Sequence, residues 1–175
     1  HIKKNKMKTE KIYVLGAPGS GKSYLANKLS SLLKIPHYDM DDVRFIKKFT
    51  KIRTKEKRKQ KVDKIHKNKK WIIDARGTGW DRHSMLKADT IIWIKTPPHK
   101  RTLRILKRYL KRKNDSNLEE KFSDQFPLIK YSLSYEFGKK LTSLKPTKEF
   151  LKKHNLNPII LKNNKEINDF IKKLK

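Results

Sequence analysis

Eight consecutive residues near the start of the chain have the types and the spacing that phosphate binding requires. They fit the pattern G-x-x-x-x-G-K-[ST] at every fixed position, and they are Gly16, Ala17, Pro18, Gly19, Ser20, Gly21, Lys22 and Ser23. Glycines let successive backbone N–H groups converge on phosphate oxygens. The lysine of this pattern reaches the β- and γ-phosphates, and the final hydroxyl binds Mg²⁺. These residues, with Tyr24 directly after them, therefore predict binding of a nucleoside triphosphate and magnesium.

This chemistry needs a strand before the loop and a helix after it. The apolar run at residues 11–15 predicts a buried strand that ends at a glycine turn. Residues 22–33 predict a helix, because their leucines fall on one apolar stripe. The N-terminus of such a helix adds a dipole that favours anions. Both required elements are predicted, which argues against a glycine-rich turn without function.

The rest of the chain alternates short apolar runs with helical patterns. Further strands are predicted at residues 36–38, 71–74, 90–94 and 158–161. Helices are predicted at residues 42–69 (two helices broken near Thr50), 99–113, 119–144, 146–154 and 167–174. The helix at 119–144 is expected to pack through one face that contains Phe122, Phe126, Ile129, Leu133 and Phe137, with Tyr131 and Tyr135 also packed. This alternation is typical of an α/β fold with a parallel sheet covered on both faces.

Carboxylates follow two of the predicted strands at the points where those strands end. Asp39 and Asp41 follow the second strand, and Asp74 ends the third. Ligands of open α/β sheets bind at this carboxyl edge. For Asp39 and Asp41 two interpretations stay open, a role in the site and capping of the next helix, while Asp42 is best explained as a cap. A role in the site is favoured for Asp74, because an unpaired buried charge in a core is costly.

The chain is strongly basic, with 47 lysines and arginines, 17 acidic residues and a net charge of +30. Residues 44–70 hold 14 basic residues against two acids, and residues 95–113 hold nine basic residues and no acid. Either segment could be a nucleic-acid footprint, because phosphate contacts release counterions. The alternative is a solvated, lysine-rich surface with no specific partner.

Arginines are few but regularly placed in the second basic segment. Four of the nine arginines in the chain, Arg101, Arg104, Arg108 and Arg112, recur at i, i+3, i+7 and i+11 and so share one side of a helix. The planar guanidinium grips phosphate bidentately, whereas lysine acts as a point charge. We therefore predict that this row handles phosphate, with Arg104 and Arg108 as its central members.

Length and composition set limits on the architecture. A chain of 175 residues is long enough for one domain, which we place at residues 10–175, after a lead at residues 1–9 that we expect to be disordered or added to the protein. The absence of cysteine excludes disulfides, a thiol nucleophile and cysteine-bound zinc. No apolar run approaches the length of a membrane span. We expect a cytoplasmic protein without a membrane partner, and a monomer is favoured.

Five segments together resemble the small P-loop kinase superfamily, which includes adenylate kinase, shikimate kinase and other nucleoside or nucleotide kinases. The segments are residues 16–23, 35–42, 71–74, 88–94 and 101–112. The greatest similarity is to the adenylate-kinase-like group often labelled topology modulation protein. The resemblance implies a three-layer α/β/α P-loop NTPase fold with five parallel strands in the order 2-3-1-4-5. It also implies an acceptor-binding region at about residues 42–70 and a helical lid at about residues 99–120.

The resemblance also implies roles for the candidate site residues. Asp41 is expected to act as a base or to orient the acceptor, Asp39 to hold magnesium through water, and Asp74 to lie near magnesium. Arg44 and Arg76 follow the same strand edge and could clamp an acceptor phosphate; the alternative is that both are ordinary surface arginines.

The combined features favour an ATP- and Mg²⁺-dependent kinase with a small acceptor, for which a nucleotide or nucleoside is favoured. Catalysis would then involve Lys22, Asp41, Asp74, Arg104 and Arg108, and Arg104 would also contact ATP. The alternative is a nucleic-acid-binding or DNA-topology-modulating P-loop ATPase. A polynucleotide 5′-kinase lies between the two. The first hypothesis is favoured because the segment between the second and third strands is short for wrapping a duplex.

Overall fold

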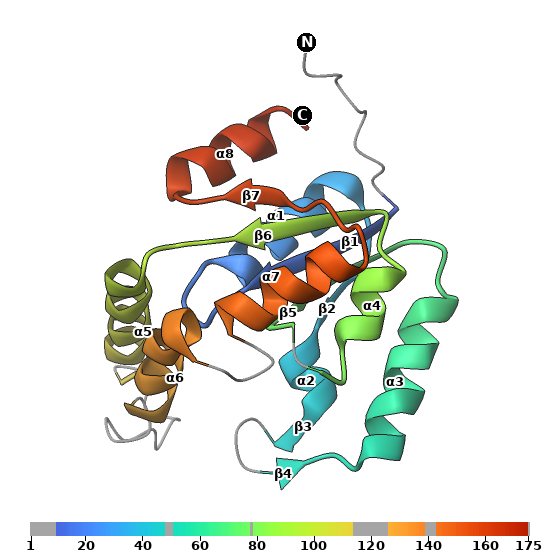
Figure 1. Ribbon diagram of the computed structural model, residues 1–175, viewed down its shortest axis with the longest axis horizontal. Helices are drawn as coiled ribbons and strands as arrows, with labels where there is room; N and C mark the ends of the chain where they lie inside the picture. Colours follow the sequence, from blue (N-terminus) through green and yellow to red (C-terminus); the bar gives the residue numbers. More distant parts are fainter. Residues whose placement is uncertain (1–9, 48–50, 78, 114–125, 139–142, 175) are drawn as a thin grey trace.

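A five-stranded parallel sheet forms the centre of the computed structural model, which describes residues 10–47, 51–77, 79–113, 126–138 and 143–174 (Figure 1). Its strands are β1 (Lys11–Gly16), β2 (His37–Asp39), β5 (Trp71–Ala75), β6 (Thr90–Ile94) and β7 (Ile159–Leu161). They lie in the order β2-β5-β1-β6-β7, which confirms the order 2-3-1-4-5 when only these five strands are numbered along the chain. The expected lead at residues 1–9 and the expected lid residues 114–120 lie outside the described residues.

Helices cover both faces of the sheet, as predicted. Ile12 and Val14 of β1 pack with α1 (Lys22–Leu33) and α8 (Asn164–Lys172). Tyr13 and Leu15 point to the opposite face, because side chains alternate along a strand. That face is covered by α2 (Met40–Arg44), α3 (Lys55–Lys67), α4 (Arg82–Leu86) and α7 (Leu144–Lys153). Burial on both faces explains why β1 is a continuous apolar run.

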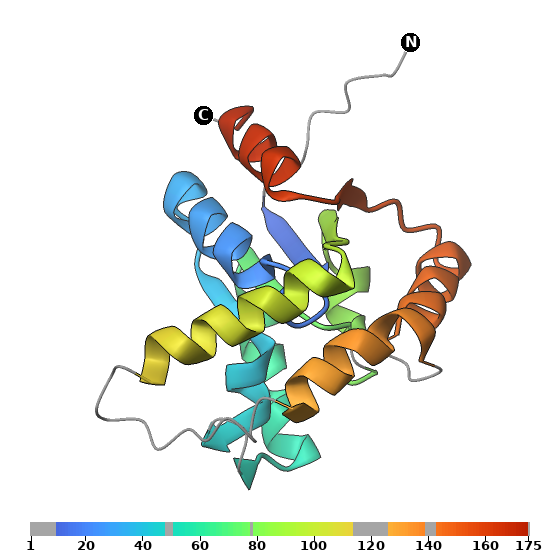
Figure 2. The same cartoon turned by 90° about the vertical axis from the view of Figure 1, so that its left-hand side faces the viewer.

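Two further helices, α5 (Pro98–Lys113) and α6 (Phe126–Phe137), lie in contact with each other at the carboxyl end of the sheet (Figures 1 and 2). They therefore flank the edge at which the phosphate-binding segment leaves β1. Within the described part of the chain, no helix combines the length and the apolar character that crossing a bilayer requires.

The prediction of two helices over residues 42–69 was wrong in its first half. Helix α2 ends at Arg44, and β3 (Phe45–Lys47) pairs in antiparallel fashion with β4 (Lys51–Ile52). Arg53 stabilises the point at which the chain leaves α2 and enters the hairpin. Its Nη1 donates to the carbonyl oxygens of Asp42 at 2.5 Å and Val43 at 3.1 Å, and to that of Phe45. These are carbonyls that a helix end leaves without intrahelical partners, so a distant arginine decides where α2 ends.

The long helix predicted at residues 119–144 was also wrong. Helix α6 ends at Phe137, Gly138 follows it, and α7 begins at Leu144; residues 119–125 lie outside the described residues. The predicted packed face was wrong at Phe126 and Leu133, which are 57% and 45% exposed, whereas Tyr135 is buried as predicted. The residues of α6 that point inward include Ser132 and Tyr135. These two side chains bond to the guanidinium of Arg101 on α5 and to the indole N–H of Trp93 on β6. The buried side of α6 is therefore itself polar.

Candidate phosphate and magnesium site

Residues 16–23, called the phosphate loop below, connect the end of β1 to the first turn of α1. Gly19 and Gly21 have φ values of 76° and 99°, a left-handed conformation that glycine adopts without steric cost. Space is limiting at Gly19 in addition, because a Cβ there would lie 2.6 Å from the backbone oxygen of Arg101. The backbone N–H of Ser20 donates to the carbonyl of Ala17 at 3.1 Å and closes the turn. The glycines of the motif are therefore required by this backbone.

A cavity of about 210 Å³ lies between the phosphate loop and α5. Loop and α1 residues line one side and α5 residues line the other: Gly19, Gly21, Lys22, Ser23 and Tyr24, facing Arg104, Ile105 and Arg108. The structure thus brings the predicted nucleotide-binding residues together with both central arginines of the row. The side chain of Arg112 lies outside the described residues. With a lysine and two arginines around it, the cavity suits an anionic ligand.

The two predicted magnesium carboxylates lie side by side, because Asp39 of β2 and Asp74 of β5 are paired in register. Burial and the charge of Asp74 raise the pKa of Asp39 to about 6. Burial also acts to raise the pKa of Asp74, but interactions with His37, Lys22 and Ser23 outweigh it and hold that pKa below its usual range. The Nε2 atom of His37 lies 3.7 Å from Oδ1 of Asp74. These shifts place both carboxylates within electrostatic reach of the phosphate loop.

The oxygens at this position fit a magnesium ion. Asp74 is fully buried, and its carboxylate oxygens lack a hydrogen bond of ordinary length from the described residues; Nε2 of His37, 3.7 Å from Oδ1, is beyond that length. Buried polar atoms usually have partners, so these oxygens are suited to a ligand. Mg²⁺ prefers oxygen ligands and keeps several of its waters. Asp39, Asp74 and the Ser23 hydroxyl could hold such an ion, and its charge would relieve the repulsion that raises the pKa of Asp39.

Asp39 also serves the local fold, so the two interpretations of this residue are compatible. Its Oδ1 accepts from the backbone N–H of Asp41 at 2.7 Å and caps α2. Asp42, expected to be the cap, is exposed within α2, and its carboxylate does not occupy that position. The cap is one residue before the helix because β2 runs directly into α2, so the last residue of the strand supplies it.

The acceptor residues predicted near this edge form an ion pair. Arg76 donates through Nη2 to Oδ1 of Asp41, and both side chains are largely buried. The guanidinium of Arg76 also lies 5.5 Å from the ring centroid of Tyr131 on α6. Arg44 packs its guanidinium over the ring of Phe45 at 5.3 Å. Neither Arg44 nor Arg76 is an ordinary exposed surface arginine.

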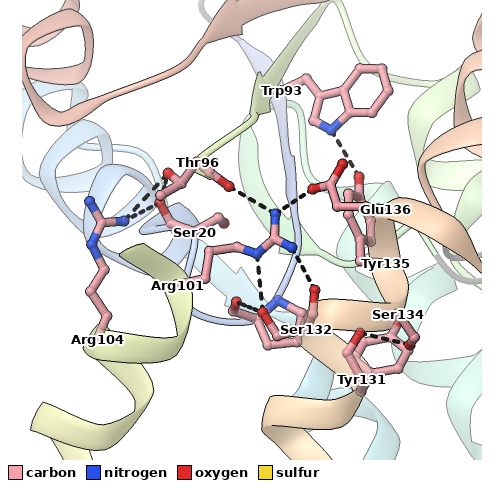
Figure 3. A network of polar contacts seen from close by, with 11 residues as sticks. Ser20, Trp93, Thr96, Arg101, Arg104, Tyr131, Ser132, Ser134, Tyr135 and Glu136 are labelled. Atoms are coloured by element: carbon pink, nitrogen blue, oxygen red, sulfur yellow. Dashed lines mark hydrogen bonds and ion pairs between the residues drawn. The ribbon is translucent and has the colours of Figure 1, made fainter. Parts of the chain in front are cut away.

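Arg104 holds α5 against the phosphate loop. Its Nη1 donates to the carbonyl oxygens of Gly19 at 3.1 Å and Ser20 at 2.7 Å, and its Nη2 donates to Oδ1 of Asn164 at 2.5 Å. The Thr96 hydroxyl donates to the same Ser20 oxygen at 2.8 Å. Figure 3 shows Arg104 and Thr96 converging on Ser20.

Arg101 does not point in the same direction as Arg104, although the arginine row was predicted to share one side of the helix. It is only 1% exposed, and its guanidinium bonds to Thr96, Ser132 and Glu136 (Figure 3). Residues three apart on a helix differ by about 60° in direction, so Arg101 points to α6 while Arg104 points to the loop. Sequence reasoning missed Thr96 and Ser132. Two signals in the sequence could have identified them. Thr96 places a hydroxyl just beyond the fourth strand, and Ser132 is a small polar residue within an apolar helix.

Comparison with known families identifies the fold. A family profile described as AAA domain matches residues 12–124, which is more than half of the chain. The chain belongs to this AAA domain family. The matched part of this AAA domain contains the phosphate loop, the paired carboxylates and the arginines of α5.

One relative of this AAA domain is the uncharacterized protein YqaC of Bacillus subtilis (strain 168), which is 32% identical over 102 residues. The match covers 58% of this chain and 57% of the relative, so the chain spans little more than half the length of that protein.

Two solved structures extend the similarity over nearly the whole chain. Shikimate kinase from Acinetobacter baumannii in complex with shikimate is 16% identical with a TM-score of 0.57, over 96% of this chain and 92% of that one. A gluconokinase from Sinorhizobium meliloti 1021 is 12% identical with a TM-score of 0.59, over 95% and 89%. The chain therefore shares the fold of these two structures, as the resemblance implied.

Proposed function

We propose that the protein is an ATP-dependent kinase that uses Mg²⁺ and moves the γ-phosphoryl group of ATP to a small acceptor. The observation that carries this proposal is the cavity between the phosphate loop and α5, with Lys22 on one side and Arg104 and Arg108 on the other. Buried carboxylate oxygens of Asp74 lie within reach of Lys22. Phosphoryl transfer depends mainly on positioning and charge neutralisation, and this arrangement suits both.

The residues of the loop and of α5 divide this work. Lys22 binds the β- and γ-phosphates, and the N–H groups of the loop bind their oxygens. Ser23, Asp39 and Asp74 would hold a magnesium ion, which would supply charge neutralisation for the phosphates. Arg108 neutralises charge on the group in transfer, and Arg104 contacts ATP while it keeps α5 on the loop. Helix α5, the described part of the expected lid, closes over the site and excludes water.

We place the Asp41–Arg76 pair on the acceptor side. Asp41 directly precedes the proposed acceptor region at residues 42–70, and Arg76 follows β5, the strand after that region. Asp41 orients the acceptor oxygen, and takes its proton where that oxygen is a hydroxyl. As this oxygen forms its bond to the γ-phosphorus, the bond to ADP breaks and ADP leaves. Arg76 and Arg44 hold an anionic group of the acceptor. Two arginines favour an acceptor that carries phosphate, so a nucleotide is preferred over a nucleoside. The structural neighbours, a shikimate kinase and a gluconokinase, support a small acceptor in general.

Incubation with Mg·ATP and a panel of acceptors tests the proposal. The panel contains nucleoside monophosphates, nucleosides and shikimate-like polyols, and mass spectrometry detects a gain of one phosphoryl group. Asp74→Asn is the matched control, because it keeps the side-chain shape and removes the charge. The expected result is transfer to at least one acceptor that the control loses. Tight binding of Mg·ATP without transfer to any member would contradict the kinase proposal.

One observation favours a second candidate, a P-loop protein that acts on nucleic acid. Six lysines of α3 are exposed, namely Lys55, Lys57, Lys59, Lys61, Lys64 and Lys67. Such a surface binds phosphate backbones through counterion release, so affinity falls steeply with salt. Titration of DNA and RNA oligonucleotides at several salt concentrations measures this slope. Absence of oligonucleotide binding near physiological salt would exclude this candidate. Transfer of phosphate from ATP to the 5′-hydroxyl of an oligonucleotide would mean that the protein is both a kinase and a nucleic-acid-binding protein.

A further inference from the structure

A buried polar network joins α6 to the phosphate loop through Arg101 (Figure 3). The guanidinium of Arg101 donates to the carbonyl of Thr96 at 2.8 Å, to the carbonyl of Ser132 at 2.5 Å and to Oε1 of Glu136 at 2.7 Å. Its Nε donates to the Ser132 hydroxyl at 3.1 Å. The side chains of Arg101 and Ser132 are inaccessible to solvent. Helix α6 is therefore fixed to the first turn of α5 by a charged group that is almost fully paired.

Ser132 passes this contact on to the loop. Its hydroxyl lies 3.2 Å from the carbonyl oxygen of Pro18 and donates to it. A serine hydroxyl has one proton and two lone pairs. Because Arg101 Nε–H occupies a lone pair of that oxygen, the hydroxyl proton is free to point to Pro18. Arg101 thus sets the direction of a bond that ends on the phosphate loop.

Three successive carbonyls of the loop are held from outside in this way. Ser132 binds that of Pro18, Arg104 binds those of Gly19 and Ser20, and Thr96 binds that of Ser20. A trans peptide is planar, and its N–H points opposite to its C=O. Holding these carbonyls outward therefore turns the N–H groups of Gly19 and Gly21 the other way, as a phosphate-binding loop requires.

We propose that Arg101 and Ser132 are positioning residues that keep the phosphate loop in its nucleotide-binding shape. Neither lines the cavity beside the loop. They act through Pro18, and they make α6 a structural requirement of nucleotide binding. A phosphate loop that loses this contact spends a smaller fraction of time in its nucleotide-binding shape. The apparent affinity for nucleotide falls in proportion to that fraction. The inference rests on the proposed nucleotide site and adds to it a helix that the sequence motif does not include.

Two single-atom changes on the same helix test the proposal. Ser132→Ala removes the hydroxyl that binds Pro18. Ser134→Ala is the matched control, because its hydroxyl bonds to the carbonyl of Tyr131 at 3.0 Å on the exposed side of α6. Titration calorimetry measures the Kd for Mg·ATP, and hydrogen exchange measures protection of the loop in nucleotide-free protein. We expect Ser132→Ala to raise the Kd about two- to tenfold, the range of one hydrogen bond, and to speed exchange in the loop. Ser134→Ala should change neither.

Equal Kd values and equal loop exchange in the two variants would overturn the proposal. So would a Ser132→Ala protein that loses stability toward urea but keeps the wild-type Kd, because Ser132 would then serve only helix packing. Arg101→Lys is the second variant; it keeps the charge, loses the planar fork and should raise the Kd more than Ser132→Ala does. If the wild type failed to bind Mg·ATP, the proposed function would fail, while the exchange comparison would still test the link from α6 to the loop.

Discussion

Replacing Asp39 by asparagine should make the nucleotide-free protein more stable and its magnesium site weaker. The carboxylate of Asp39 lies next to the buried carboxylate of Asp74, and its pKa is raised to about 6 by burial and by that charge. Asparagine caps a helix about as well as aspartate does. Asp39→Asn therefore keeps the bond from the N–H of Asp41 that caps α2 and removes only the charge.

The size and the pH range of this effect follow from the pKa. The folded-state value of about 6 lies above the usual 3.8, so the folded protein holds the proton of Asp39 more tightly than the unfolded chain does. The contribution of Asp39 to stability is complete below about pH 4 and is lost as the pH rises through 6. A shift of about two units corresponds to about 3 kcal/mol as an upper bound. Because Asp39 is only partly buried, solvent screening reduces this to about 1–2 kcal/mol.

Urea denaturation between pH 4 and pH 7 measures this contribution. Asp42→Asn is the control, since it removes an exposed carboxylate from the same helix. Asp39→Asn should match the wild type near pH 4 and exceed it by about 1–2 kcal/mol at pH 7, or by about 2–8 °C in Tm. Mg²⁺ should stabilise the wild type more than Asp39→Asn. The reasoning would be refuted by a stability gain that is the same at pH 4 and pH 7, or by an equal gain in Asp42→Asn.

Three further outcomes are expected. Lys22→Met should lower Mg·ATP turnover by about a hundredfold or more with an unchanged circular dichroism spectrum; substantial residual turnover would remove Lys22 from the mechanism. Gly19→Ala should lower the free energy of unfolding in urea by about 2 kcal/mol or more, because left-handed backbone costs alanine about 1–2 kcal/mol and its Cβ would lie 2.6 Å from the Arg101 oxygen; a neutral effect would mean that α5 is not held there. Arg104→Lys should weaken binding of ADP by about 1–3 kcal/mol, because lysine cannot bridge the carbonyls of Gly19 and Ser20; calorimetry would expose the error if affinity were unchanged.

The phosphate loop was predictable because its chemistry depends on neighbours in the chain. Gly19 and Gly21 have positive φ, and Lys22 begins the helix. The buried β1 was predicted from its apolar run, which is a local pattern, whereas the strand order was expected only from the resemblance. The structure pairs Asp39 with Asp74, because their two strands are neighbours in the order that the resemblance implied and the carboxyl ends of adjacent parallel strands meet at one edge.

The end of α2 and the buried side of α6 depend on partners far along the chain. For both features the prediction from the local sequence pattern was wrong. The helical pattern after Asp42 gave way to a hairpin because Arg53 binds the carbonyls at the end of α2. The apolar face assigned to α6 points outward at Leu133, because the inward side packs on a buried arginine. Neither outcome can be derived from propensity, since tertiary contacts override weak local preferences.

The amino-acid sequence by itself determined that the chain carries a phosphate loop between a strand and a helix, with carboxylates at the ends of two predicted strands. Those features follow from residue types at fixed spacing. The tertiary structure decided that the arginines of α5 contact different parts of the protein. Arg104 binds the loop, while Arg101 turns into the protein and binds Ser132. The physical reason is that the sequence fixes only how the arginines are arranged around their own helix. The packing of α5 between the loop and α6 decides which groups each arginine contacts.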